Sequence, residues 1–303
     1  MPDAHPEPLA APFSHPSPPL LPELPDGVEP TPLAPQWRAW TAFAALVVGF
    51  VFAAVGAVVL TLIGGAFNGA SLASGKFAHP SPAVNILATV VQDLCLIGAA
   101  VIFARLAGRP RPWDFGLHGT RFWPAVGWGV LTLTAFWFVT LGWVKLVGAS
   151  NATEKLPTEL GADQSTVALV CVGVLVCVVA PLAEEFFFRG FFFTALRSWK
   201  GIWPAAVITG LIFGAIHGGS SDIAFLVPLA FFGFSLCLLY ARTRSLYPCI
   251  AVHASNNAIA FCSSQGWGLT TGIAVLAGAL ALVALVCWLV RLAAGPTPAW
   301  ALS

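Results

Sequence analysis

The sequence predicts an all-α protein, a polytopic transmembrane helix bundle of about eight spans that follows a disordered, proline-rich N-terminal tail. Three observations support this fold class. The 303 residues are 58% hydrophobic and only 9% charged, whereas a soluble domain carries roughly 25% charged residues. Apolar runs of about 20 residues, the length that crosses a bilayer, follow one another along the chain. Half of the 24 prolines precede the first of these runs.

Residues 1–37 form the predicted tail. They contain five acidic residues and no Lys or Arg, and a composition so rich in proline cannot bury a core. The segment lacks both the basic start and the continuous apolar stretch of a secretory signal. We therefore expect a solvated tail, with a proline-rich ligand for a partner domain as the alternative.

The apolar runs after Arg38 predict eight helices, separated by breaks that carry Gly, Pro, Asn and Ser. The fifth and seventh runs are short and interrupted by polar residues. The predicted helices are 40–63, 83–106, 122–148, 166–188 with a helical continuation to about 198, 202–218, 223–241, 247–262 and 268–291.

The Lys and Arg residues predict the orientation of these spans. With the N-terminus inside, ten basic residues fall on inner loops, and only Lys76, Lys145 and Lys155 fall on the outer side. Basic residues concentrate on the cytoplasmic side of membrane proteins. We expect a multi-pass protein of the cell inner membrane with both termini in the cytoplasm.

Charge and cysteine content exclude several other classes. A formal net charge of +1 gives no reason to expect nucleic acid or a strongly acidic partner. The seven cysteines include no C-x-x-C pair and lie in or beside apolar runs, which favours reduced structural thiols over disulfides or a zinc knuckle. The oligomeric state is not predicted.

Two acids and an arginine lie in the fourth apolar run, as Glu184-Glu185-x-x-x-Arg189. A charge at mid-bilayer costs about 2.5–3.5 kcal/mol, so the group needs a structural or a catalytic reason. Residues four apart on a helix are neighbours, which predicts an ion pair between Glu185 and Arg189. Glu184 points about 100° away from Glu185, and we expect it to be free for acid–base chemistry.

The fifth run places a histidine beside a ridge of small residues. Ala206, Gly210, Gly214 and Gly218 recur every four residues, a pattern typical of closely packed helices. His217 projects from nearly the same face. The pattern favours an imidazole turned into the bundle, either as a packing hydrogen-bonder or as part of a site.

The seventh run contains His253 and Asn257, which are four apart and share one helical face. Both side chains can donate to a single oxygen, as an oxyanion requires. His253 would lie only about 11 Å deep if its helix began at Leu246, against about 20 Å for Glu184. An extended Ser245–Pro248 segment, with Pro248 at the first helical position, would remove this difference.

The second run also carries polar residues at membrane depth, namely Asn85, Gln92 and Asp93. They favour either a hydrogen-bonded packing cluster or a functional proton site.

Three motifs, taken in order, resemble those of a known family. Glu184-Glu185-x-x-x-Arg189, Phe213-x-x-x-His217 and His253-x-x-x-Asn257 are similar to the motifs of the CPBP family. That family comprises the CAAX prenyl endopeptidases and the Abi-type bacteriocin-processing or bacteriocin-immunity proteins. The resemblance covers about residues 166–262.

The resemblance implies an intramembrane endopeptidase that depends on a glutamate. By position in the motifs, Glu184 would activate water and His217 would help to position it. The tetrahedral intermediate would be stabilised by His253 and Asn257. The remaining motif residues would support the site: the pair Glu185 and Arg189, and Phe213 in the cavity wall.

The cofactor stays open at this point. Glu184, His217 and His253 would make a two-histidine, one-carboxylate zinc site with an open position. No H-E-x-x-H motif is present, so metal-free activation of water by Glu184 and His217 is the alternative.

The resemblance divides the chain into four parts: the tail at 1–37, accessory transmembrane helices at 38–165, a catalytic helical core at 166–262, and a C-terminal transmembrane helix with a short tail at 263–303. We expect the substrate to be a membrane-embedded or C-terminal peptide. A proton- or ion-coupled transporter, with Asp93, Glu184 and the two histidines as a relay, is a competing function. A membrane scaffold or immunity protein without turnover is another.

Overall fold

The computed structural model describes residues 35, 37–67, 80–149, 152 and 154–295. Most of the predicted N-terminal tail, Lys76 and the last eight residues lie outside this part of the chain. Within it, all regular secondary structure is helical, as predicted.

The helices lie within a few residues of the predicted runs. The long ones are α1 (Ala39–Phe67), α2 (Pro82–Ala104), α3 (Phe122–Leu146), α8 (Ile202–Ile216), α9 (Leu226–Thr243), α10 (Leu246–Ser264) and α11 (Leu269–Ala294). The fourth run is one helical rod over Thr166–Lys200, built from α5 (Thr166–Val174), η5 (Leu175–Val179), α6 (Ala180–Glu185), η6 (Phe186–Phe193) and α7 (Thr194–Lys200).

Seven helices of the described chain are long and apolar enough to cross a membrane. The seventh predicted span, 247–262, forms α10, which carries His, Asn and Ser residues and is not among these seven helices. About half of its residues are buried against other helices. The protein is thus an integral multi-pass membrane protein in which α10 is an interior helix, with His253 and Asn256 buried.

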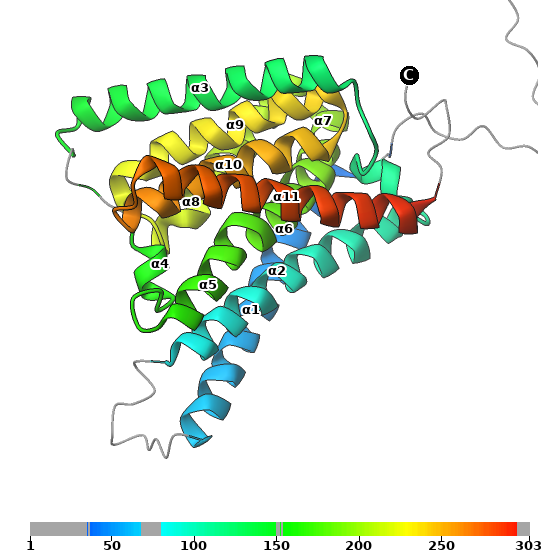
Figure 1. Cartoon of the computed structure of the whole chain (residues 1–303). Helices are drawn as coiled ribbons and strands as arrows, with labels where there is room; N and C mark the ends of the chain where they lie inside the picture. Colours follow the sequence, from blue (N-terminus) through cyan, green and yellow to red (C-terminus); the bar gives the residue numbers. More distant parts are fainter. Residues whose placement is uncertain (1–34, 36, 68–79, 150–151, 153, 296–303) are drawn as a thin grey trace, which may run out of the picture. The chain divides into compact units, whose positions relative to one another are not determined.

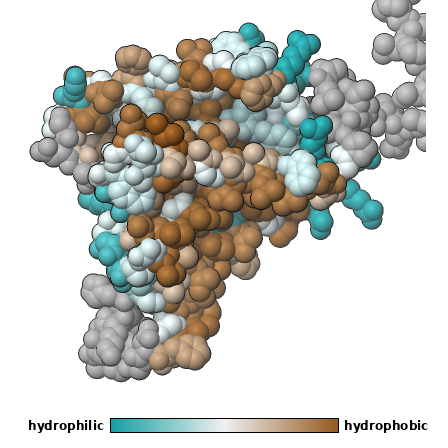
Figure 2. Space-filling view, in the orientation of Figure 1, coloured by the Kyte–Doolittle hydropathy of each residue, from teal (hydrophilic) through white to brown (hydrophobic). Residues whose placement is uncertain are grey.

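The helices pack in pairs around the rod. α1 lies against α2, α8 against α9, and α10 lies between α3 and α11 (Figure 1). Large apolar side chains are exposed along α1, α3 and α11, and Figure 2 shows apolar residues over much of the visible face. Such a surface suits contact with lipid.

Two segments of the rod are π-helical, η5 and η6. They flank α6, the short α-helical segment that carries Glu184 and Glu185. A π-helical turn widens the helix and shifts the direction of the following side chains, and such turns are frequent at functional sites. Seven of the eight residues of η6 are buried, so this part of the rod is the centre of the core.

The predicted small-residue ridge is the contact between α8 and α9. A Cβ atom at Gly210 would lie 2.6 Å from the carbonyl oxygen of Ala230, and one at Gly214 would lie 2.5 Å from that of Leu226. The backbones can approach this closely only because neither glycine has a side chain.

Helix α10 begins in a different way from the prediction. It starts at Leu246 with Ser245 as its N-cap, so the predicted extended segment up to Pro248 is wrong. Ser245 Oγ donates to the carbonyl of His118 (2.6 Å), and the backbone N–H of Leu246 donates to that of Gly116 (2.9 Å). Both residues are fully buried. The first turn of α10 therefore lies beneath the loop that precedes α3. Its depth in the bundle does not have to match that of the other helix ends.

The loop before α3 also covers the start of the folded region. Trp37, which the sequence assigns to the tail, is buried and contacts the ring of Phe115 at a centroid distance of 4.9 Å and that of Phe191 at 5.1 Å. The folded region thus includes at least this residue of the predicted tail.

Candidate active site

Glu185 joins two helices through one oxygen atom. Arg189 Nη1 donates to Glu185 Oε1 (2.7 Å), which is the predicted i, i+4 ion pair. His253 Nδ1 of α10 donates to the same oxygen (2.7 Å). Both Glu185 and Arg189 are 0% exposed, so the ion pair is buried and fixes the imidazole ring relative to the rod.

Arg189 makes further contacts within the core. Its Nη2 donates to the carbonyl of Gly233 on α9 (3.1 Å), and its guanidinium lies 4.6 Å from the ring centroid of Phe213. A buried charge is tolerated when it is paired and hydrogen-bonded in this way.

Glu184 faces away from this ion pair, as the helical geometry predicts. Its Oε2 lies 3.9 Å from Nε2 of His253, and that oxygen has no hydrogen-bond partner in the described part of the chain. The side chain of Glu184 is 17% exposed, whereas that of Glu185 is fully buried. The two adjacent acids thus differ, because one is tied into the core and the other reaches a cavity.

His217 lies at the end of α8, on the small-residue face that the sequence indicates. Its Nδ1 is 2.7 Å from the carbonyl oxygen of Phe213. A carbonyl oxygen can only accept, so Nδ1 carries the proton and Nε2 of a neutral ring is an acceptor. Phe213 is not among the residues that line the cavity, in contrast to the prediction. It is fully buried behind the wall, 4.8 Å from the His217 ring and 5.8 Å from the His253 ring between centroids.

Asn257 lies one turn after His253 and also faces the rod. Its Nδ2 donates to the carbonyl of Val176 in η5 (2.9 Å). An amide group has two N–H donors, so one remains beyond this bond. The neighbouring Asn256 lines the same cavity, and its Nδ2 lies 3.4 Å from Oδ1 of Asn257.

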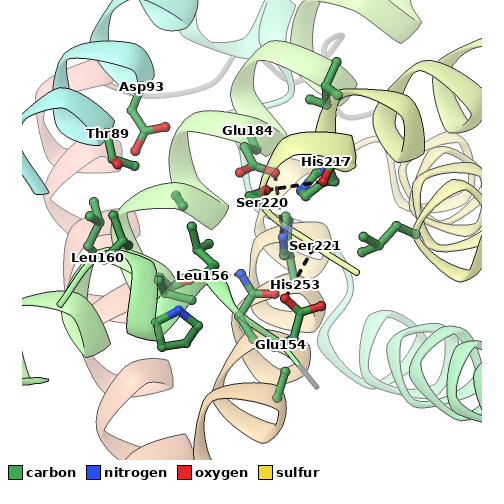
Figure 3. A pocket seen from close by; sticks show the side chains of 18 of the residues that line it. Thr89, Asp93, Glu154, Leu156, Leu160, Glu184, His217, Ser220, Ser221 and His253 are labelled. Atoms are coloured by element: carbon green, nitrogen blue, oxygen red, sulfur yellow. Dashed lines mark hydrogen bonds and ion pairs between the residues drawn. The ribbon is translucent and has the colours of Figure 1, made fainter. Parts of the chain in front are cut away.

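These side chains line one cavity of about 370 Å³. Figure 3 shows the carboxylate of Glu184 between the side chains of Asp93 and His217, with His253 below. The cavity brings together Glu184, His217, His253 and Asn257, which are the four residues that the motifs single out as catalytic. The remaining motif residues, Glu185, Arg189 and Phe213, support it from behind.

Two acidic residues outside the motifs also line this cavity. Asp93 comes from α2 and is 2% exposed. The sequence marks it as polar at membrane depth, but does not place it next to Glu184. Glu154 precedes the rod, and its Oε2 accepts from Ser221 Oγ (3.3 Å). Burial raises the pKa of Glu154 above its ordinary value. No sequence signal marks Glu154, because it lies outside the apolar runs and the motifs.

The three residues of the predicted zinc site, Glu184, His217 and His253, all line this cavity. In the described residues, no group of three His, Cys, Asp or Glu side chains is arranged to hold a metal ion. Nδ1 of His253 and Nδ1 of His217 are both engaged by protein oxygens. These bonds leave Nε2 of each ring as the nitrogen that could bind a metal ion, so the zinc site stays a prediction.

The comparison with protein families identifies the core of the chain. Residues 166–259 match the family described as type II CAAX prenyl endopeptidase Rce1-like. The matched segment covers the rod, α8, α9 and most of α10, and it contains all three motifs. The resemblance that the motifs indicate is therefore confirmed over this helical core.

Three bacterial proteins are similar over parts of the chain. The putative membrane peptidase YdiL of Bacillus subtilis (strain 168) is 29% identical over 36% of this chain and 43% of its own length. An uncharacterized 24.3 kDa protein of Escherichia coli is 35% identical over 34% of this chain and 48% of its own. The UPF0177 protein YxdF of Lactococcus lactis subsp. lactis (strain IL1403) is 25% identical over 45% of this chain and 72% of its own.

The chain thus spans less than half the length of the first two of these proteins. No solved structure matches the chain. The family description and the name of the first relative are both those of peptidases.

Proposed function

We propose that this protein is an intramembrane endopeptidase that hydrolyses peptide bonds of membrane-associated substrates. The observation that carries the proposal is the division of the two adjacent acids. Glu185 binds both Arg189 and His253 through Oε1, while Glu184 reaches the cavity beside His253 with one oxygen unpartnered. A carboxylate held in this way is placed to take a proton from water.

Glu184 and His217 act on the attacking water. Glu184 removes its proton as the water oxygen bonds to the substrate carbonyl carbon. Nε2 of His217 accepts a hydrogen bond from the same water, because its Nδ1–H is directed to the carbonyl of Phe213. This division of labour needs no metal ion.

His253 and Asn257 stabilise the negative charge that develops on the carbonyl oxygen. In its doubly protonated form, His253 donates from Nε2, while Glu185 holds Nδ1 and so fixes the direction of the ring. Asn257 donates through the N–H that does not bind Val176. Preorganised donors of this kind are worth about 10²–10³-fold in rate each.

The substrate is a membrane-embedded or C-terminal peptide that reaches the cavity from the bilayer. The apolar outer surface and the distribution of basic residues support a multi-pass protein of the inner membrane with cytoplasmic termini. The family description makes a prenylated C-terminal peptide one probe to use.

The proposal is tested with purified full-length protein in lipid vesicles. The probes are a mixture of single-span peptides and a farnesylated C-terminal peptide, and products are identified by mass spectrometry. We expect cleavage by the wild type, and at least about 100-fold slower cleavage by Glu184→Ala and His217→Ala. Addition of the chelator phenanthroline should leave the rate unchanged.

Each alternative predicts a different outcome. Cleavage unaffected by either substitution would overturn the assigned roles. Inhibition by phenanthroline would favour the zinc site over metal-free activation of water. A protein that cleaves nothing but dissipates an ion gradient across the vesicles would be a transporter. A protein that does neither would be a scaffold or immunity factor.

A further inference from the structure

Asp93 is a buried carboxyl group that the mechanism above does not use. It lies on α2, 2% exposed, and its Oδ2 has no hydrogen-bond partner in the described part of the chain. It lines the same cavity as Glu184 and interacts with it electrostatically. In Figure 3 its carboxyl group projects from α2 into the cavity, on the side of Glu184 away from His217.

Among the described residues, the elements around Asp93 offer it no Lys or Arg as an ion-pair partner. The elements packed against α2, together with the cavity wall, carry these titratable side chains among the described residues: Arg105, Glu154, Cys171, Cys177, Glu184, Glu185, Arg189, His217 and His253. α1 contributes none. Arg189 is held by Glu185 and Gly233, and Arg105 is exposed at the end of α2.

A carboxyl group that is buried without a partner is stabilised in its neutral form, because an unpaired charge loses its hydration. A second carboxylate in the same cavity strengthens this preference, since two like charges at one site do not both ionise readily. Glu184 is the more exposed of the two acids and lies beside Nε2 of His253. Asp93 is therefore the member of the pair that is suited to hold a proton, and Glu184 remains the base of the proposed mechanism.

Hydrolysis of a peptide bond needs a proton donor as well as a base. The amine is a poor leaving group unless its nitrogen is protonated as the C–N bond breaks. The proposed mechanism assigns the base and the oxyanion donors, but leaves this acid unassigned.

Resting on the proposed endopeptidase function, we propose that Asp93 is the general acid that protonates the leaving nitrogen. Glu184 takes one proton from water while the water oxygen bonds to the carbonyl carbon. As the C–N bond breaks, Asp93 gives its proton to the nitrogen and becomes a carboxylate. Glu184 then returns its proton to Asp93 through cavity water, so the site is restored and the net reaction consumes one water.

The first test needs no substrate. Infrared difference spectra of the purified full-length protein are recorded during a pH titration for the wild type, Asp93→Asn and Glu184→Gln. The control is Glu159→Gln, which removes an exposed carboxylate outside the cavity. We expect a protonated-carboxyl band at neutral pH in the wild type and the control that is missing in Asp93→Asn. In Glu184→Gln the band should disappear at a lower pH, because the neighbouring negative charge is gone. A band that Asp93→Asn leaves unchanged overturns the inference.

The second test compares a peptide substrate with its depsipeptide, in which an ester replaces the cleaved amide. An ester oxygen leaves without prior protonation, so loss of the acid should affect only the amide. We expect Asp93→Asn to slow peptide cleavage about 100-fold and to change depsipeptide cleavage little, with partial recovery in Asp93→Glu. Glu184→Gln should slow both.

The outcomes separate the two proposals. Equal slowing of both substrates by Asp93→Asn overturns the acid role, while the endopeptidase function stands. A wild-type protein that cleaves neither substrate overturns the function. In that case the infrared titration alone shows whether Asp93 holds the proton.

Discussion

His253 and Arg189 bind the same oxygen atom of Glu185, each at 2.7 Å. The ion pair that looks purely structural in the sequence therefore also sets the direction of a proposed catalytic imidazole. Removing the charge of Glu185 would leave a buried guanidinium without its counterion, which costs about 3–5 kcal/mol.

This arrangement predicts that substitution of Glu185 lowers both stability and activity, whereas substitution of Glu184 lowers mainly activity. We expect Glu185→Gln to lower the free energy of unfolding by about 3–5 kcal/mol and to reduce cleavage as well. Glu184→Gln should slow cleavage at least about 100-fold with little loss of stability. Thermal unfolding in detergent, measured beside the cleavage assay, checks both. Equal stability of the two variants would contradict the assignment.

The close contact between α8 and α9 predicts the effect of Gly210→Ala. The new Cβ would lie 2.6 Å from the carbonyl oxygen of Ala230, and overpacking of this kind costs about 1–3 kcal/mol. Gly98→Ala is the matched control, since no atom lies within 4 Å of its Cβ. That control should be neutral or stabilise the helix by up to about 1 kcal/mol. A melting temperature for Gly210→Ala at or above that of Gly98→Ala would contradict the packing.

The buried cap of α10 predicts a loss of stability in Ser245→Ala. The hydroxyl group accepts from the N–H of Tyr247 (3.3 Å) and donates to the carbonyl of His118 (2.6 Å). Loss of an N-cap costs about 0.5–2 kcal/mol, and a shifted α10 should also slow cleavage because His253 moves with it. Ser255→Ala is the control, because within the described residues the Ser255 hydroxyl group bonds to the carbonyl of Ala251, in the preceding turn of its own helix. Equal unfolding midpoints for the two variants would show that the cap is not needed.

Glu154 predicts a pH dependence of stability. Its pKa is raised by burial, with a smaller opposing effect of the Ser221 hydrogen bond. A carboxyl group whose pKa is higher in the folded than in the unfolded protein favours folding below the unfolded value, and this contribution is lost as the pH rises through the folded value. We expect Glu154→Gln to match the wild type at acidic pH and to exceed its melting temperature at neutral pH and above. A constant difference between the two across the pH range would rule this out.

Much of the fold follows from patterns that the sequence shows directly. Apolar runs give the helix bounds to within a few residues, because lipid forces the backbone into continuous helices. The same reasoning wrongly predicts a membrane span at the polar run 247–262, which folds as the interior helix α10. Hydropathy alone cannot distinguish a helix that faces lipid from one that is surrounded by protein.

The site was predictable where it depends on a single helix. The ion pair of Glu185 with Arg189, and the different direction of Glu184, follow from helical spacing. The contact between Glu185 and His253 could not be predicted, because it depends on how α10 packs against the rod. Asp93 and Glu154 reach the cavity through tertiary packing of the same kind.

The role of Glu184 is measured most directly in water labelled with heavy oxygen. The wild type and Glu184→Gln are incubated with the same cleaved peptide in lipid vesicles, and the new C-terminal carboxyl group is analysed by mass spectrometry. The account predicts that the wild type inserts one labelled oxygen atom per cleaved bond, and that Glu184→Gln forms this product at least about 100-fold more slowly. Labelled product formed at the same rate by both proteins would contradict it.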